Sequence, residues 1–304
     1  MRSAQIASVT ACEVCRSGNV ALLRHSDRWD FDVIRCRDCG MVFVAGADVG
    51  RAEEVTRDED PIDWDGYVSV MRADDSLRQN VLTQLQSRFA HGTAPVLFDV
   101  GAGAGDFLLL ARTHGFDVTG NELSAGAIRY AQERHGLALS PLLLEDQPAQ
   151  SVDVITMWCV VAHVADPRAF LGAAFEMLRP GGVLFLRTPR WCLIDHVGVR
   201  LDRYSRGRMP HIADRRVFPG HGHMFGAANM RSLLREIGYT EVQARPTCHY
   251  SLDTTTYIEG TGGVMRGLRR YSRAVDRMVE HNLAPRNALL VYATRPSADV
   301  RDAG

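Results

Sequence analysis

Residues 95–105 read PVLFDVGAGAG, and this stretch decides the fold. An apolar run of strand length ends at Gly101, and an apolar segment that starts a helix follows from Phe107. A strand, a glycine-rich turn and a helix in this order bring backbone N–H groups close to a ligand. The dinucleotide-binding fingerprint G-x-G-x-x-G has a glycine or alanine at its last position, where this chain has Asp106. Its carboxylate would repel a pyrophosphate but could face the ammonium group of an amino acid.

A second strand is expected at residues 116–120, and it ends at Asn121 and Glu122. An acidic side chain about 20 residues beyond the glycine turn can accept hydrogen bonds from both ribose hydroxyls of an adenosine. Glu122 is therefore the candidate ribose ligand.

The alternation of strands and helices continues along the chain. Strands are expected at 139–144, 152–158 and 183–188, and helices at 67–89, 124–135 and 167–178. Short connections between alternating elements specify a doubly wound, mostly parallel α/β sheet. Ligands of such sheets bind beyond the carboxyl ends of the strands.

The N-terminal region carries two C-x2-C pairs, Cys12/Cys15 and Cys36/Cys39, separated by 20 residues. Each pair can point two sulfur atoms at one centre, and two such turns complete a tetrahedral zinc site. Gly40 directly follows the second pair, where a sharp turn commonly needs a positive φ. Short strands between the pairs predict a small zinc ribbon. Four thiolates close the coordination sphere, so the predicted zinc is structural.

Composition excludes several classes of function. All 35 basic residues are Arg, which removes mechanisms that need a lysine, and the formal net charge of -1 does not suit a general nucleic-acid binder. No apolar run is long enough to span a membrane. The N-terminal residues lack the apolar stretch of a secretory signal, so the seven cysteines predict a reducing, cytoplasmic setting.

Several segments together resemble class I S-adenosylmethionine-dependent methyltransferases, in the subgroup that carries an N-terminal zinc ribbon. The segments that carry the resemblance are FDVGAGAGDFL (98–108), GNELSAGAIRYAQ (120–132), SVDVITMWCVVAHVADPRAFL (151–171), LRPGGVLFLRTPR (178–190), HGHMFGAANMRSLLREIGY (221–239) and NALLVYATRP (287–296). The resemblance implies a Rossmann-like, seven-stranded methyltransferase sheet and binding of S-adenosylmethionine, with S-adenosylhomocysteine as the product.

The resemblance also implies a cofactor site, residue by residue. In this site, the glycine turn and the start of the next helix would contact the methionyl part of the cofactor. The ends of the following strands would contact its adenosine. The implied residues are Tyr67, Gly101, Ala102, Gly103, Asp106, Phe107, Glu122, Leu123, Glu145, Asp146, Trp158 and Cys159. The family's motif has an acidic residue where this chain has Cys159 and a glutamate where it has Ala162, so catalytic roles do not transfer directly.

Methyl transfer requires orientation of a nucleophile and, for some acceptors, removal of its proton. Histidine suits the second task because its pKa lies near neutrality. His163, after the fourth strand, and His223, before a later helix, are the candidate bases.

Four regions are expected: a zinc-ribbon module (1–48), a linker with a cofactor-capping helical segment (49–92), the methyltransferase core (93–296) and a tail (297–304). Insertions at 189–227 and 247–285 are rich in arginine and would form a substrate cap, in which some arginines could face an anionic acceptor.

The leading interpretation is a methyltransferase that acts on a small molecule in specialised (natural-product) metabolism. Three alternatives stay open: a related reaction without methyl transfer such as a cyclisation, methylation of ribosomal RNA, and a non-catalytic scaffold that binds S-adenosylmethionine. Two protein partners are compatible with the sequence: a carrier protein and a second copy of the chain. No membrane partner is expected, and nucleic acid is disfavoured.

Overall fold

The computed structural model describes residues 11–26, 30–46, 63–71, 75–90, 92–205, 222–248, 277–278, 281 and 283–297. The chain divides into two compact units, a ribbon unit and a sheet unit, each built from several segments. The ribbon unit consists of Met1–Val49, Thr188–Met230 and Ala244–Leu290, and the sheet unit of Gly50–Arg187, Arg231–Gln243 and Val291–Gly304.

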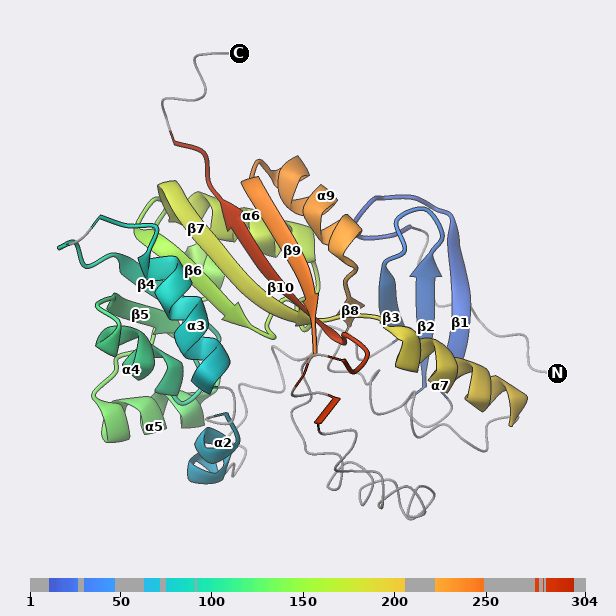
Figure 1. Ribbon diagram of the computed structural model, residues 1–304, viewed down its shortest axis with the longest axis horizontal. Coiled ribbons are helices and arrows are strands. Elements are labelled where there is room, and N and C mark those ends of the chain that lie inside the picture. Colours follow the sequence, from blue (N-terminus) through green and yellow to red (C-terminus); the bar gives the residue numbers. More distant parts are fainter. Residues whose placement is uncertain are drawn as a thin grey trace. The chain divides into compact units, whose positions relative to one another are not determined.

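A six-stranded sheet in the order β5-β4-β6-β7-β10-β9 forms the centre of the α/β fold (Figure 1). Its strands are β4 (Val96–Val100), β5 (Asp117–Asn121), β6 (Val152–Trp158), β7 (Leu178–Pro189), β9 (Thr240–Thr247) and β10 (Ala288–Thr294). β5, β4, β6 and β7 pair in parallel. Backbone bonds join Gly181 to Arg295 at one end of β7 and Arg190 to Asn287 at the other, so β10 runs antiparallel. The predicted doubly wound α/β architecture is confirmed, but in the described residues the sheet has six strands where the resemblance implies seven.

The helices have conventional start and stop signals. They are α2 (Trp64–Met71), α3 (Asp75–Gln86), α4 (Asp106–Thr113), α5 (Ala125–His135), α6 (Pro167–Met177), α7 (Leu193–Tyr204) and α9 (Ala227–Ile237). Ser124 caps α5 by accepting the N–H of Ala127, and Asp166 caps α6 with Pro167 in its first turn. The structure places two helices, α2 and α3, where the sequence predicts one continuous helix over 67–89.

The prediction of a strand at 139–144 is wrong. In this segment the structure has one parallel bridge, between Asn121 and Ser140. Ser140 donates its N–H to Gly120 and accepts from Glu122. The next residue is Pro141, which has no N–H to continue a ladder. A short 3-10 turn, η2 (Leu144–Asp146), follows.

The ribbon unit contains a four-stranded sheet in the order β1-β2-β3-β8. Its strands are β1 (Val20–Ser26), β2 (Phe31–Cys36), β3 (Val42–Gly46) and β8 (His223–Met224). All pairings are antiparallel, and β8 adds Met224 opposite Val42 at the edge of β3. The predicted insertion at 189–227 therefore supplies a strand and α7 to the ribbon unit, while most of the insertion at 247–285 lies outside the described residues.

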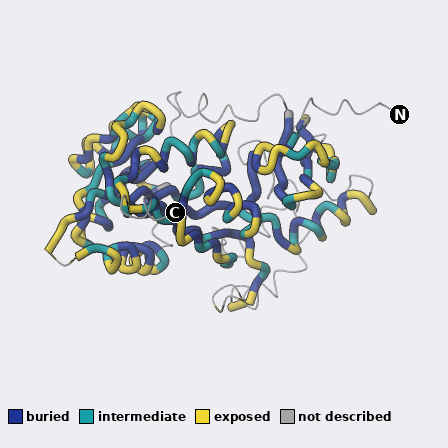
Figure 2. The backbone as a smooth tube through the Cα atoms, turned by 90° about the horizontal axis from the view of Figure 1, so that it is seen from above, coloured by how far each residue is buried: buried dark blue, intermediate teal, exposed yellow. Residues whose placement is uncertain are grey.

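The buried residues concentrate in the strands, whereas the helices keep one exposed side (Figure 2). Within the sheet unit, Arg295 ties β10 to the end of α6, because its guanidinium donates to the carbonyl oxygens of Phe175, Glu176 and Leu178 at 2.6–2.9 Å. Among the described residues, no helix is both long and apolar enough to cross a membrane.

Candidate functional site

The turn after β4 is built from backbone that only glycine adopts without strain. Gly101, Gly103 and Gly105 have φ values of 65°, 55° and 82°. A Cβ added to Gly101 would lie 3.0 Å from Val160, and one added to Gly105 would lie 2.6 Å from Leu137. The turn therefore presents bare backbone at the carboxyl end of β4, where ligands of parallel sheets bind.

Glu122 lies directly after β5 and faces this turn. Its Oε2 accepts the N–H of Gly103 at 2.8 Å, and its Oε1 accepts those of Leu123 at 2.7 Å and Ser124 at 3.0 Å. Three backbone donors fix the carboxylate and leave part of its acceptor capacity for a ligand.

Asp106 begins α4 and forms an ion pair with Arg78 of α3. Both side chains are buried, with 9% and 6% of their surface exposed. The Arg78 guanidinium also lies 5.9 Å from the ring of Phe107 and 5.7 Å from that of Trp158, distances at which a cation and a ring attract each other. A positive and a negative group thus lie together beside the glycine turn.

Sequence reasoning missed Arg78, although a signal for it exists. The buried side of α3 consists of Arg78, Val81, Leu82 and Leu85, so one arginine occupies a position in an otherwise apolar helical stripe. Such a residue is rarely buried without a charged partner. Arg78 has two acidic partners. Asp75 lies three residues earlier on α3, at 3.7 Å, whereas Asp106 lies 28 residues further along the chain, where sequence spacing does not identify it.

Asp99, in β4, is a second missed residue. It is 2% exposed and accepts a hydrogen bond from the Thr156 hydroxyl at 2.6 Å. Burial raises the pKa of Asp99 to about 7; Thr156 and Arg78 oppose this rise, whereas Asp106 and Glu122 add to it. The site therefore holds the carboxyl groups of Asp99, Asp106 and Glu122, and Arg78 is a cation that acts on the first two.

Trp158 ends β6 and packs against Phe107 and Phe185, with ring centroids 5.0 Å apart in both pairs. The Arg187 guanidinium lies 5.2 Å from the Trp158 ring. The indole Nε1 of Trp158 is buried and has no hydrogen-bond partner among the residues that the structure describes. Cys159 follows with φ 67°, an uncommon value for a residue with a side chain. Strained backbone of this kind is frequent at functional sites.

For the remaining cofactor candidates the structure gives the position and the burial. Ala102 is buried in the glycine turn and Leu123 is half-buried, whereas Glu145 and Asp146 are exposed in η2. Tyr67 lies in α2, and its side chain is outside the described residues.

The two candidate bases fall in different units. His163 lies in the loop after β6 in the sheet unit, half-buried, with its N–H bonded to the Val160 carbonyl. His223 lies in β8 of the ribbon unit, 3% exposed, and its Nε2 contacts the carboxylate of Glu13. The role of His223 as a base stays a prediction, and within the ribbon unit the residue is buried in β8.

The four predicted metal ligands converge in the ribbon unit. The sulfur atoms of Cys12, Cys15, Cys36 and Cys39 lie within 4.8 Å of one another. Cys12 and Cys39 are 3.6 Å apart and Cys15 and Cys36 are 3.5 Å apart, close to the spacing of thiolates around a tetrahedral ion with metal–sulfur bonds of about 2.3 Å. Burial raises the pKa of the Cys12 thiol to about 11, an effect that a bound cation would offset.

The turns that carry these cysteines are well supported. Gly40 has the predicted positive φ, 75°, and its N–H bonds to the Cys36 carbonyl. Asn229 of α9 donates to the carbonyl oxygen of Cys39 at 3.2 Å, so a later segment of the ribbon unit also holds the second turn.

Comparison with known proteins shows which family the chain resembles. A family model described as a methyltransferase domain matches residues 74–244, more than half of the chain. The ubiquinone biosynthesis O-methyltransferase of Idiomarina loihiensis is 32% identical over 101 residues, which make up 30% of this chain and 41% of that protein. The mitochondrial enzyme of the same name from Schizosaccharomyces pombe is 29% identical over 137 residues, 41% of this chain and 49% of that protein.

The chain thus spans less than half the length of these two relatives. Among solved structures, Haemonchus contortus phosphoethanolamine N-methyltransferase 2, in complex with phosphomonomethylethanolamine and S-adenosylhomocysteine, is similar with a TM-score of 0.50 at 14% identity. That likeness covers 72% of this chain and 53% of the other, and at this identity it concerns the fold alone.

Proposed function

Because the chain belongs to the methyltransferase-domain family, we propose that it transfers a methyl group from S-adenosylmethionine to a small-molecule acceptor. The observation that most supports this proposal is the buried Arg78–Asp106 pair beside the glycine turn. The amino-acid end of S-adenosylmethionine carries a carboxylate and an ammonium group. A paired cation and anion offer the opposite charges to both of them.

Each part of the site has a place in this proposal. The bare backbone of Gly101 to Gly105 lets the methionyl part approach closely, with Arg78 at its carboxylate and Asp106 at its ammonium group. Glu122, already oriented by three N–H groups, accepts from the ribose. When bound, the cofactor supplies a sulfonium-activated, electrophilic methyl group, so the chain mainly has to orient the acceptor and exclude water.

For an acceptor that must lose a proton, we assign the role of base to His163. It lies in the loop after β6, at the carboxyl edge of the sheet. We assign His223 a structural role, because it is buried in the ribbon sheet and its Nε2 is engaged by Glu13. The names of the relatives, ubiquinone biosynthesis O-methyltransferases, favour a small organic acceptor. The placement of the reaction in specialised metabolism is a proposal that rests on the resemblance to the zinc-ribbon subgroup alone.

Calorimetry with two ligands tests the cofactor assignment. S-adenosylhomocysteine contains both adenosine and amino-acid parts, whereas methylthioadenosine lacks the amino-acid part. Glu122→Ala should weaken both ligands by roughly 1–3 kcal/mol, the cost of leaving charged hydrogen bonds unmade. Arg78→Gln should weaken S-adenosylhomocysteine about tenfold or more but leave methylthioadenosine unchanged.

Glu133→Ala, an exposed change on α5, is the matched control and should bind both ligands like the wild type. Binding of NAD in place of S-adenosylhomocysteine would refute the cofactor assignment. Equal losses for both ligands in Arg78→Gln would refute the role given to the arginine.

We also propose one structural Zn²⁺ held by Cys12, Cys15, Cys36 and Cys39, because four sulfur donors at these distances suit a closed tetrahedral site. The small ribbon core would then depend on metal for part of its stability. Metal analysis should find about one zinc per chain, and Cys36→Ser should lower both the zinc content and the melting temperature. Cys248→Ser, which changes a thiol bonded to the Ala284 carbonyl, should retain the metal. Full zinc retention in Cys36→Ser would contradict the proposal.

A further inference from the structure

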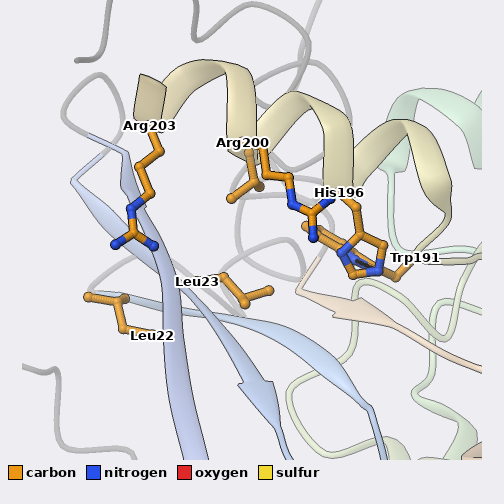
Figure 3. Close-up of a pocket in the computed structure, with 7 residues that line it drawn as sticks. Leu22, Leu23, Trp191, His196, Arg200 and Arg203 are labelled. Atoms are coloured by element: carbon orange, nitrogen blue, oxygen red, sulfur yellow. Dashed lines mark hydrogen bonds between the residues drawn. The ribbon is translucent and has the colours of Figure 1, made fainter. Parts of the chain in front are cut away.

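A pocket of about 240 Å³ opens within the ribbon unit, between β1 and α7 (Figure 3). Leu22 and Leu23 of β1 form one side, and residues of α7 with the preceding Trp191 form the other. Leu23 and Trp191 both pack against the apolar core of the ribbon sheet, so each side of the pocket has one residue that rests on that core. Its volume is slightly below the range of about 300–1,000 Å³ common for ligand sites, which suits a small molecule or the end of a larger one.

The polar groups of this pocket are hydrogen-bond donors. Trp191 Nε1 lies 3.1 Å from His196 Nε2, and because an indole N–H can only donate, Nε2 must accept. His196 is therefore neutral and carries its proton on Nδ1. Burial and the nearby Arg35 and Arg200 lower the pKa of His196 against the opposing effect of Asp195, and this direction agrees with the neutral state.

Arg200 and Arg203 extend from α7 along the pocket, and they provide its charge. In the part of the chain that the structure describes, neither has a carboxylate partner. The two acids of α7 are engaged elsewhere: Asp195 accepts the Cys192 N–H at 2.6 Å, and Asp202 pairs with Arg24 at 2.5 Å. Among the described residues, the pocket therefore combines two arginines and a neutral N–H donor with apolar walls, and none of those that line it is acidic.

We propose that this pocket binds an organic phosphate whose other end is apolar or aromatic. Arg200 and His196, which lie near each other in Figure 3, would hold the phosphate, and Arg203 would add charge from the far end. Guanidinium groups match the geometry of phosphate oxygens, and the imidazole N–H supplies a further donor. The apolar part would lie on Leu23 and the ring of Trp191. All residues of this site belong to the ribbon unit, and the proposal uses none of the residues assigned to the cofactor.

Titration with phenyl phosphate, followed through the indole N–H resonances, tests the proposal. The Trp191 signal, identified with Trp191→Phe, should shift saturably because its N–H is bonded to a pocket residue. Arg200→Ala and His196→Phe should each weaken binding, the arginine change by about tenfold or more, in line with a charge-assisted hydrogen bond. Arg235→Ala, an exposed change on α9, should leave binding unchanged.

Three further probes define the ligand class. Inorganic phosphate should bind more weakly than phenyl phosphate, benzyl alcohol should not shift the Trp191 signal, and benzoate should bind more weakly than phenyl phosphate. Equal binding of benzyl alcohol, or unchanged binding in Arg200→Ala, would overturn the anion site. If inorganic phosphate bound as tightly as phenyl phosphate, the apolar walls would not contribute to binding. If benzoate bound more tightly than phenyl phosphate, the proposed preference for a phosphate would be wrong. Calorimetry with S-adenosylhomocysteine on the same samples separates these outcomes from a failure of the cofactor assignment.

Discussion

Replacing Asp99 by Asn should change how the stability of the protein depends on pH. The Asp99 side chain is buried in β4, two residues before Gly101, and accepts a hydrogen bond from the Thr156 hydroxyl at 2.6 Å. An asparagine oxygen can accept the same hydrogen bond, but the amide does not titrate. The substitution therefore removes a proton equilibrium while keeping the size of the side chain.

The magnitude follows from the pKa of Asp99, which burial raises from 3.8 to about 7 against the opposing effect of Arg78. Such a change corresponds to about 4 kcal/mol, because each tenfold change in an equilibrium is worth about 1.4 kcal/mol. Between these two pH values the unfolded chain has released the proton and the folded chain has kept it. The contribution of Asp99 to stability therefore falls as pH rises from about 4 to about 7 and is constant above that.

Urea unfolding at several pH values between 4 and 8 measures this effect. The wild type should lose up to about 4 kcal/mol relative to Asp99→Asn over this range, because the other titrating groups are common to both proteins. Asp117→Asn, at the exposed start of β5, should follow the wild type. Parallel pH profiles for the wild type and Asp99→Asn would mean that Asp99 is already ionised in the folded protein, and would refute the reasoning.

Three other substitutions test the geometry of the site. Cys159→Gly should stabilise the protein by about 0.5–1 kcal/mol, since glycine tolerates the φ of 67°; denaturant midpoints should show no such gain for Cys159→Ala. Gly105→Ala should cost more than Gly115→Ala, because both have φ above 80° but only the first would bring a Cβ to 2.6 Å from Leu137; equal losses would show that Leu137 adjusts freely. His163→Ala should lower kcat by about 10²–10⁴-fold and leave the cofactor affinity little changed, and activity should recover at higher pH. Normal turnover of this variant at neutral pH would mean that orientation of the acceptor alone supports the reaction.

The sequence predicts the α/β architecture well because its signals are local. The apolar run before Gly101, the glycine turn and the acidic residue after the next strand are all read within some 30 residues, and the structure brings Gly103 and Glu122 into direct contact. The prediction of a strand at 139–144 was wrong because it rested on the apolar pattern and took no account of Pro141. Proline has no N–H to donate, and the pairing ends after one bridge.

The residues that the sequence does not reveal depend on contacts between distant segments. Arg78 becomes meaningful only when α3 packs beside Asp106, and the pocket between β1 and α7 joins segments some 170 residues apart. The position of His223 is a similar case. Its neighbours along the chain indicate the approach to a helix, yet its partners are β3 and Glu13, near the other end of the sequence.

The pairing of β8 with β3 has a consequence for the order of events during synthesis. The four cysteines and the first three strands leave the ribosome early, but Met224 reaches Val42 only after some 180 further residues have been made. At about 5–20 residues per second, this interval is on the order of 10–40 s. During it, β3 has an open edge of unpaired backbone groups, which is a template for association with other chains. Early metal capture would hold the nascent ribbon in register until its last strand arrives.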